Sequence, residues 1–353
     1  MNLRVDKVAS VACRLGFAKE VDVSTEIECQ AGTTIVVRAL RQKRVYREIE
    51  LANGRMSTVM KGDVILGALG RRRALRGFSG DVPESLKVGD AVEILNRGGV
   101  VGRSHGEHKD YGKPLSCEVL GTPVRDGRPV RVSDAAVPRV SSLAGLRVPP
   151  LVIVSGSGME VGKTLVVSEL VQDFARSGLA VAGGKLTGIA CLRDLIALED
   201  HGARATASFL DAGFPSTVGL GAETTVEVAK SVIAHLTASS PEVVFLELGD
   251  GILGEYGVLP ILADPEIRAA ARAHVFCAAD LVAAWGGCHL LRARGVAVDL
   301  VSGPVTDNRF AAAYVERELG AKAINAYAEP QRLAEFVREL LGSRARSAAG
   351  GEA

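Results

Sequence analysis

A glycine-rich run in the middle of the chain has the residue types of a phosphate-binding loop (P-loop, or Walker A motif). Its nine residues are Gly156, Ser157, Gly158, Met159, Glu160, Val161, Gly162, Lys163 and Thr164. Glycines let backbone N–H groups turn toward an anion, a lysine adds positive charge for the β- and γ-phosphates, and a threonine hydroxyl is a ligand for Mg²⁺. An apolar run precedes the loop and an amphipathic helical pattern follows it. The pattern therefore predicts a site for a nucleoside triphosphate with Mg²⁺.

Two lysines could neutralise the charge that develops during phosphoryl transfer. Lys163 belongs to the glycine-rich loop, and Lys185 follows the second apolar run, residues 180–184. In a doubly wound sheet the carboxyl ends of the strands face the ligand crevice, so a lysine at such an end can reach a γ-phosphate and an acceptor. We therefore interpret Lys163 and Lys185 as catalytic charge stabilisers.

Oxygen-bearing side chains could hold the Mg²⁺ that accompanies the nucleotide. Thr164 carries a hydroxyl, Glu247 ends a buried apolar strand, and Asp194 opens a helix. Hydroxyl and carboxylate oxygens are ligands that Mg²⁺ prefers, so these three residues are the predicted metal ligands. Asp194 could instead interact with the dipole of its helix. Asp250 competes for the same metal role, although Gly251 after it favours a turn.

The loop resembles that of the dethiobiotin synthetases. Counted from Gly156, its spacing is one residue longer than GxxxxGK[ST], and Gly-Ser-Gly-Met-Glu-Val-Gly-Lys-Thr is similar to the family's Gly-Thr-x-Thr-x-Val-Gly-Lys-Thr. Three later features are also similar to that family. Lys185 resembles its second active-site lysine, and residues 193–198 resemble the helix start whose aspartate holds the metal. Residues 243–251 resemble its strand-ending carboxylate segment. The resemblance covers about residues 150–340 and implies an ATP-dependent ligase built on a P-loop domain.

Residues that touch the substrate in that family differ in this chain. Met159 and Ile189 take the approximate places of a threonine and a serine that contact the diamine substrate. Leu186 replaces the proline that follows the second lysine. We therefore expect a different acceptor, a small molecule with a carboxylate or an amine, and we place Thr187 and Gly188 among the residues that contact it.

The residues expected to read the nucleotide base also differ. The family's base-reading asparagine is represented by Asp307 and then Asn308, after an apolar strand and Gly303. An aspartate accepts hydrogen bonds from N1–H and the exocyclic amine of guanine, whereas an asparagine can both donate to and accept from adenine. We predict that Asp307 or Asn308 contacts the base, and the choice between ATP and GTP stays open.

Two functions fit these residues. The first is an enzyme that uses ATP or GTP with Mg²⁺ to phosphorylate a carboxylate or carbamate, after which an amine or similar nucleophile displaces phosphate. The alternative is a nucleotide switch that acts on a protein partner or in cofactor insertion. Glu160 stands where a switch would be expected to carry a cation, and no KGG-type lysine precedes Gly162, so the enzyme is preferred.

The elements that must position these residues indicate two domains. Residues 1–120 alternate short β-type runs with turn signals, which predicts a smaller β-barrel or β-sandwich domain. Residues 121–150 are punctuated by prolines and predict a linker. Residues 151–342 alternate apolar strands with helical segments, which predicts an α/β P-loop NTPase domain with a doubly wound, mostly parallel sheet. Residues 343–353 predict a disordered tail.

The α/β pattern gives approximate boundaries for each element. The expected strands are residues 151–155, 180–184, 243–248, 273–278, 296–301 and 321–325. The expected helices are residues 162–177, 192–201, 224–237, 265–273, 281–294, 309–319 and 330–341.

Composition limits the classes of partner. The 353 residues carry a net charge of +1, so no global field favours nucleic acid or an anionic membrane, and neither partner is expected. No run has the pattern of a signal peptide or a membrane span, so a cytoplasmic location is expected. Six scattered cysteines predict free thiols. The expected assembly is a homodimer.

Overall fold

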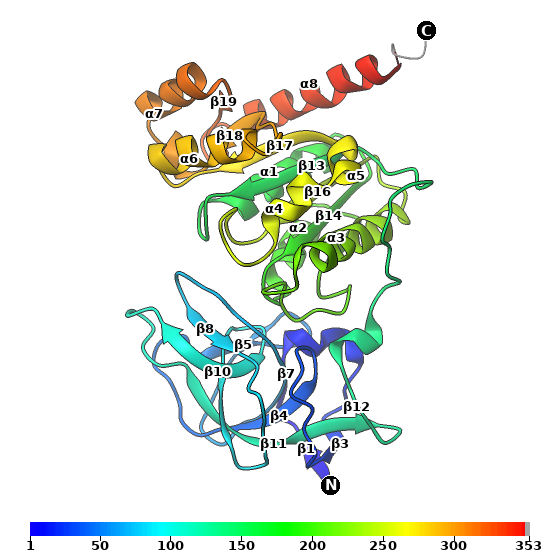
Figure 1. Ribbon diagram of the computed structural model, residues 1–353, viewed down its shortest axis with the longest axis vertical. Coiled ribbons are helices and arrows are strands. Elements are labelled where there is room, and N and C mark those ends of the chain that lie inside the picture. The colour runs from blue at the N-terminus through cyan, green and yellow to red at the C-terminus, as the bar shows by residue number, and fades with distance from the viewer. Residues whose placement is uncertain (350–353) are drawn as a thin grey trace. The chain divides into compact units, whose positions relative to one another are not determined.

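The computed structural model describes residues 1–349 and divides into two compact units (Figure 1). Unit 1 consists of Met1–Pro138, Gly188–Arg193 and Phe209–Gly219. Unit 2 consists of Arg139–Thr187, Asp194–Ser208 and the chain from Leu220 onward. Two short segments from the C-terminal half of the sequence thus pack within unit 1.

Five strands of unit 1 pair in a closed ring. The ring consists of β4 (Thr34–Ala39), β7 (Val64–Leu69), β10 (Val100–Glu107), β9 (Ala91–Ile94) and β11 (Leu115–Arg125), which pairs again with β4. The β7–β10 pair is parallel and the other four pairs are antiparallel. Because the pairing returns to its first strand, the architecture is a barrel, one of the two β-rich arrangements predicted.

Short elements surround this ring. They are β1 (Asn2–Arg4), β2 (Lys7–Val8), β3 (Glu20–Ser24), β5 (Glu48–Glu50), β6 (Met56–Thr58), β8 (Phe78–Asp81), β12 (Arg128–Pro129), and the 3₁₀ helices η1 (Ser10–Leu15) and η2 (Val132–Ala135). Strand β11 crosses residue 120, at which the β-rich domain was predicted to end, and unit 1 continues to Pro138. The prolines of this region therefore punctuate a packed segment as well as a connection.

Unit 2 contains a seven-stranded sheet. Its strands are β13 (Leu151–Gly156), β14 (Val181–Thr187), β15 (Ala205–Ser208), β16 (Val243–Leu248), β17 (Ala271–Cys277), β18 (Leu300–Ser302) and β19 (Lys322–Ala323). Their order is β15-β14-β16-β13-β17-β18-β19, and all six neighbouring pairs are parallel. This arrangement confirms the predicted α/β class with a mostly parallel sheet.

Helices cover both faces of the sheet. They are α1 (Lys163–Arg176), α2 (Arg193–Asp200), α3 (Ala222–Thr237), α4 (Val258–Ala263), α5 (Pro265–Ala270), α6 (Leu281–Arg292), α7 (Arg309–Tyr314), α8 (Pro330–Ala349), the 3₁₀ helix η3 (Pro304–Thr306) and the π-helical turn η4 (Val315–Leu319). A Cβ built on Gly183 of β14 would lie 2.8 Å from Leu198 of α2, and one on Gly184 would lie 2.8 Å from Leu236 of α3. Successive strand residues face opposite sides, so α2 and α3 lie on opposite faces.

Some element boundaries differ from those predicted. Strand β15 and helix α4 were not expected, because Ala205–Ser208 lacks an apolar run and α4 is only six residues long. Strand β18 begins at Leu300, although a strand was expected from residue 296. Helix α8 continues to Ala349, so residues 343–349 are helical where a tail was predicted, and residues 350–353 lie outside the described chain.

Two general expectations bear on the cell compartment. All six cysteines are free thiols, as predicted. Among residues 1–349, none of the helices combines the length and the apolar character needed to cross a bilayer.

A buried histidine joins the start of the phosphate loop to the neighbouring strand. His274 Nδ1 lies 2.8 Å from the Ala297 carbonyl, so this nitrogen donates, and Nε2 lies 2.7 Å from the Ser155 hydroxyl, from which the neutral ring accepts. Burial lowers the pKa of His274 below its ordinary 6.5. The neutral ring is therefore the form that fits the folded chain.

This histidine should make stability fall in mild acid. Since the pKa is lower in the folded chain, the unfolded chain takes up a proton first as the pH drops below about 6.5, and the free energy of unfolding decreases. We expect His274→Gln to lose that part of the pH dependence in melting curves recorded between about pH 7.5 and pH 5. His289→Gln, at an exposed position of α6, is the control. Equal slopes for wild type and His274→Gln would contradict the assignment.

Candidate active site

The glycine-rich loop joins β13 to α1 at the point where the strand order of the sheet reverses. Strand β13 has β16 on one side and β17 on the other. The loop starts from two backbone hydrogen bonds, Ser157 N–H to Cys277 O at 2.9 Å and Ile252 N–H to Gly156 O at 3.0 Å. It ends at Gly162, whose φ of +86° is a left-handed conformation that glycine adopts without steric cost. Unit 2 thus has the strand, loop and helix arrangement of the P-loop NTPase fold.

Two neighbouring loops fix the path of the glycine-rich loop. A Cβ on Gly251, after β16, would lie 2.6 Å from Ser157 O and 2.9 Å from Gly158 Cα. A Cβ on Gly303, after β18, would lie 2.5 Å from Val161 O. Both contacts need glycine because backbone meets backbone. A Cβ on Gly158, in contrast, would meet nothing within 4 Å, so one side of the loop is open to a ligand.

Lys163, the first residue of α1, folds back over the loop. Its Nζ donates to Gly158 O at 2.6 Å, and the residue is 6% exposed. Burial lowers the pKa of Lys163, and the nearby charge of Glu247 opposes this effect. A phosphate oxygen is a stronger acceptor for an ammonium group than a carbonyl, so an incoming nucleotide could replace this contact.

Four predicted site residues come together at the carboxyl ends of β14 and β16. Lys185 forms an ion pair with Asp194 and lies 3.4 Å from Glu247 Oε1. The Thr164 hydroxyl donates to Glu247 Oε2 at 2.9 Å. The side chains of Lys185, Asp194 and Glu247 are 15%, 17% and 7% exposed. We call Thr164, Lys185, Asp194 and Glu247 the lysine–carboxylate centre.

The register of the sheet explains this centre. Lys185 and Glu247 are Cα partners on neighbouring parallel strands, so their side chains leave the sheet side by side on the same face. Asp194 is the second residue of α2, which packs on that face. The amphipathic pattern of α1 buries Val166, Leu170 and other apolar residues against the sheet and places Thr164 beside Glu247.

The centre has the donor chemistry of a magnesium site. Thr164, Glu247 and Asp194 offer a hydroxyl and two carboxylates, which are hard oxygen ligands, and Mg²⁺ beside a nucleotide takes its remaining ligands from phosphate and water. Within residues 1–349 no group of three or more His, Cys, Asp or Glu side chains could hold a metal ion without such help. Asp250, the competing candidate, lies in the turn after β16 with a left-handed φ of +66°. Asp194 and Glu247 are both ion-paired with Lys185, and the choice between Asp194 and Asp250 as a metal ligand stays a prediction.

The two predicted base-reading residues lie in the loop that follows β18. Asp307 accepts a hydrogen bond from Asn325 Nδ2 at 2.7 Å, and Asn308 caps α7 through a bond from Phe310 N–H at 2.8 Å. Gly303 of the same loop contacts the phosphate loop at Val161. The sequence analysis did not predict that Gly303 contacts the phosphate loop or that Asn325 bonds to Asp307. The position of Gly303 directly after a strand was a signal that could have indicated its close contact.

The residues proposed to contact the acceptor have other partners. The Thr187 hydroxyl donates to Gly249 O at 2.9 Å, and Gly188 N–H donates to the Thr217 hydroxyl at 3.1 Å. Ile189 pairs with Ser216 and packs against the core of unit 1. Acceptor binding by Thr187 and Gly188 stays a prediction.

A cavity of about 330 Å³ lies in unit 2. It is formed by the segment that enters α3 and the loop between β16 and α4, and its lining includes Leu220, Thr225, Ile252, Leu253 and Val258. One of its lining residues, Ile252, donates its N–H to Gly156 O at the start of the glycine-rich loop. Its lining is mostly apolar.

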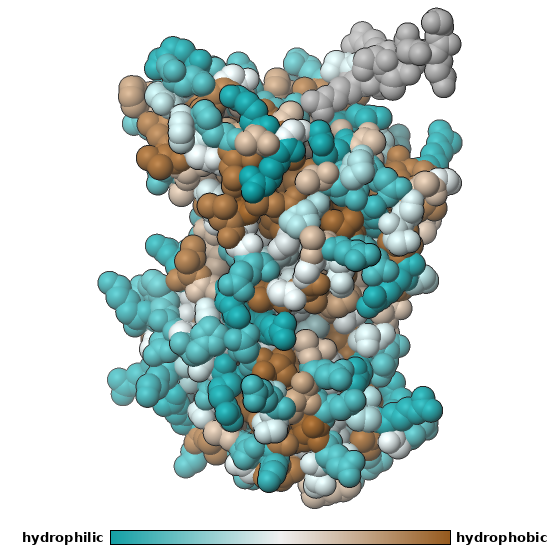
Figure 2. Space-filling model, in the orientation of Figure 1, coloured by the Kyte–Doolittle hydropathy of each residue, from teal (hydrophilic) through white to brown (hydrophobic). Residues whose placement is uncertain are grey.

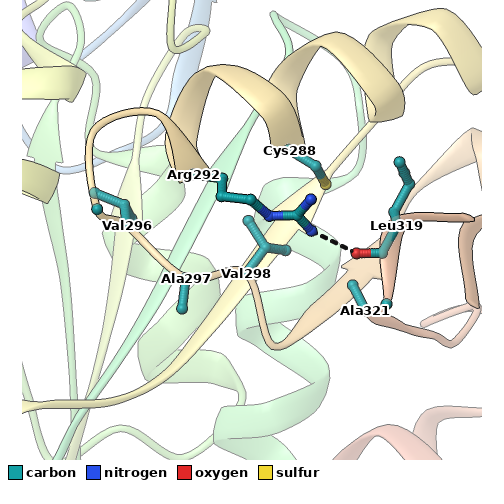
Figure 3. A pocket seen from close by; sticks show the side chains of 9 residues that line it. Cys288, Arg292, Val296, Ala297, Val298, Leu319 and Ala321 are labelled. Atoms are coloured by element: carbon teal, nitrogen blue, oxygen red, sulfur yellow. Dashed lines mark hydrogen bonds between the residues drawn. The ribbon is translucent and has the colours of Figure 1, made fainter.

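Another cavity, of about 340 Å³, lies at the opposite edge of the sheet (Figure 3). Residues 295–298, which precede β18, line it together with Cys288, Arg292 and the end of η4. Arg292 donates to Leu319 O at 2.8 Å across the cavity, and burial raises the pKa of the Cys288 thiol to about 11. The thiol is therefore protonated near neutral pH and is not an activated nucleophile.

Large hydrophobic side chains are exposed along the edge that carries the phosphate loop. Leu253 follows β16, Val282 follows β17, Phe310 follows β18 and Tyr327 follows β19, and each is at least 71% exposed. Figure 2 shows hydrophobic residues interspersed among hydrophilic ones on the visible face. Large apolar side chains exposed singly are common on protein surfaces and do not by themselves mark a contact surface. The expected homodimer stays a prediction.

No protein-family model and no curated protein matches the chain. Solved structures give partial likenesses. The signal recognition particle receptor FtsY from Elizabethkingia anophelis is 15% identical over 57% of this chain and 68% of its own, with a TM-score of 0.40. The hydrogenase maturation factor HypB from Archaeoglobus fulgidus is 13% identical over 55% and 89%, with a TM-score of 0.33. A DUF1611 family protein from Anabaena variabilis is 14% identical over 61% and 66%, with a TM-score of 0.43. The fold assignment rests on the sheet and the loop described above.

The contact of Gly251 with the phosphate loop gives a test of the site. In Gly251→Ala the new Cβ must displace loop backbone, which costs ~1–3 kcal/mol, so nucleotide affinity should fall roughly ten- to hundredfold. Fluorescence titration with a labelled nucleotide measures it, and thermal melting checks the fold. Gly286→Ala, on α6 with open space around the new Cβ, should keep wild-type affinity. Unchanged affinity in Gly251→Ala would show that the loop does not carry the site.

Proposed function

We propose that the chain is a Mg²⁺-dependent enzyme that transfers the γ-phosphoryl group of ATP or GTP to a small carboxylate or carbamate. The observation that carries the proposal is Lys185, a second lysine that lies with Asp194 and Glu247 beside the Thr164 hydroxyl. A positive charge at this strand end, next to a P-loop, suits the stabilisation of a transferring phosphoryl group.

The glycine-rich loop and Lys163 bind and orient the nucleotide. Backbone N–H groups at the start of α1 favour the phosphates, since the helix dipole adds partial positive charge there. Lys163 already lies over the loop and can exchange its contact with Gly158 O for a phosphate oxygen. These interactions bind the nucleotide before the reaction and orient its γ-phosphorus in line with an acceptor.

The lysine–carboxylate centre acts on the transferring group. Mg²⁺, held by Thr164, Glu247 and Asp194 when bound, supplies neutralising charge to the phosphate oxygens. With the carboxylates engaged by the metal, Lys185 is able to turn its ammonium group toward the γ-phosphate. Lys185 is then a catalytic residue that stabilises charge developing in the transition state.

The reaction proceeds in two balanced steps. An acceptor oxygen forms a bond to the γ-phosphorus while the bond from that phosphorus to the β,γ-bridging oxygen breaks, which gives an acyl phosphate and a nucleoside diphosphate. An amine then attacks the acyl carbon, inorganic phosphate leaves, and the amine releases its proton to solvent. The cavity lined by Leu220, Ile252 and Val258, of which Ile252 is bonded to Gly156 of the loop, offers an apolar surface for the acceptor's carbon skeleton.

Hydrolysis assays distinguish this enzyme from a nucleotide switch. Strong stimulation of nucleotide turnover by small amino-carboxylates supports phosphoryl transfer to a metabolite. Stimulation by protein concentration or by a protein partner alone would contradict it and favour a switch.

The two lysines should separate binding from chemistry. Lys163→Ala removes a loop charge and should abolish measurable nucleotide binding or turnover. Lys185→Ala should leave the nucleotide Kd unchanged and lower kcat by roughly 100-fold, because its charge acts on the transition state. Single-turnover assays and equilibrium titration measure the two effects.

Lys322→Ala is the matched control for the lysine substitutions. Lys322 is a surface residue of β19 that pairs with Glu316 at 3.0 Å. Its replacement should change neither the nucleotide Kd nor kcat. Full turnover in Lys185→Ala would refute the catalytic role of Lys185.

The loop after β18 should set the choice of base. Replacing Asp307 by Ala and Asn308 by Ser together removes both predicted base contacts, while serine keeps a capping oxygen for α7. We expect the ratio of GTP to ATP affinity to change roughly tenfold or more, since a base edge loses its polar partners. Competition titration measures both affinities. Wild-type affinities for both nucleotides would contradict base reading by this loop.

A further inference from the structure

Glu50 is a buried carboxylate of unit 1. It ends β5, has no exposed surface, and accepts two backbone hydrogen bonds from the segment 188–193. Its Oε2 lies 2.6 Å from Leu192 N, and its Oε1 lies 2.9 Å from Arg193 N. A carboxylate removed from water is costly unless it is hydrogen-bonded, so this double contact accounts for its burial.

The two amides that Glu50 accepts from lie at the start of α2. Arg193 is the first residue of that helix, and the first N–H groups of a helix have no partner within it. A carboxylate at this position satisfies them and also interacts favourably with the helix dipole. Asp194, which forms the ion pair with Lys185, is the next residue along the chain.

Other residues of unit 1 hold the same segment. Asn96 Nδ2 donates to Ala190 O at 2.7 Å, and Ala190 N–H donates to Pro215 O at 2.9 Å. A Cβ on Gly98 would lie 1.9 Å from Ala190 O, so this close approach requires glycine. The connection from the strand of Lys185 to the helix of Asp194 is therefore fixed along its length.

We infer that Glu50 is a positioning residue for the lysine–carboxylate centre. It fixes the first turn of α2 and thereby presents the Asp194 carboxylate to Lys185. The inference rests on the proposed function, since it assigns Glu50 a part in the turnover of that centre.

The consequence of removing this carboxylate follows from the length of α2. The helix has eight residues, so its first turn is a large share of its hydrogen bonding. When Gln replaces Glu50, the side chain keeps one acceptor oxygen and sets an NH₂ group against the other part-buried amide, so the first turn loosens and the Asp194 side chain is no longer fixed against Lys185. The nucleotide-binding loop is part of a different segment and keeps its geometry.

The experiment compares Glu50→Gln with Glu48→Gln, a change two residues earlier on the same strand, in the full chain. In Glu50→Gln, hydrogen exchange should accelerate at residues 192–195 and stay as in wild type along α1. The nucleotide Kd should be unchanged, and kcat should fall roughly tenfold, as for residues that orient a catalytic group. Glu48→Gln should leave exchange, Kd and kcat at wild-type values.

A double substitution separates positioning from general destabilisation. If Glu50 acts through Asp194, Glu50→Gln should cause no further loss of kcat in an Asp194→Asn background. Losses that multiply, or unchanged exchange at residues 192–195 in Glu50→Gln, would overturn the inference. If Glu50→Gln does not fold, Glu50→Asp replaces it, since it retains the charge but withdraws the carboxylate by one methylene, and the same outcomes are expected.

The failure of the proposed function gives a different result. Wild-type turnover in both Lys185→Ala and Asp194→Asn would refute the proposed function, and with it the catalytic part of this inference. Accelerated exchange at residues 192–195 in Glu50→Gln would still establish the anchoring of α2 by Glu50.

Discussion

The position of Lys185 opposite Glu247 is the constraint on which the site depends. The two residues are partners in the register of neighbouring parallel strands, so the sheet itself sets two opposite charges side by side. Thr164 joins them from α1 and Asp194 from α2, and each helix is held by its apolar face. Two carboxylates this close would repel each other, and the lysine between them makes the arrangement stable without a ligand.

The same constraint relates binding to chemistry. In the proposed mechanism Asp194 and Glu247 would hold Mg²⁺ when it is bound, and the charge of Lys185 would then be available where phosphate charge develops. Lys163 donates to the carbonyl of Gly158, and in the same proposal it would exchange this contact for a phosphate oxygen. The proposed mechanism therefore needs only the redirection of two side chains that are already in place.

The sequence predicted the local segments of the site better than the contacts between segments that are far apart in the chain. The apolar run 243–248 matched β16, and the glycine spacing located the phosphate loop, because both signals are local. Glu50 had no such signal, since its partners are backbone amides 142 and 143 residues further along the chain. The choice between barrel and sandwich depended on β9 pairing with both β10 and β11, which no single segment encodes. A cytoplasmic location, a homodimer and the roles of the individual site residues stay predictions.

The two segments that unit 1 takes from the C-terminal half affect the order in which the chain can fold. During synthesis a domain generally folds once its residues have emerged, starting at the N-terminus. Residues 1–138 contain the barrel strands, but the packing of unit 1 also includes Gly188–Arg193 and Phe209–Gly219. The buried Glu50 carboxylate cannot accept its two backbone hydrogen bonds until Leu192 and Arg193 have been synthesised. Unit 1 therefore reaches its final packing only after β13, α1 and β14 have been synthesised, and residues 1–138 alone lack two segments that belong to this unit.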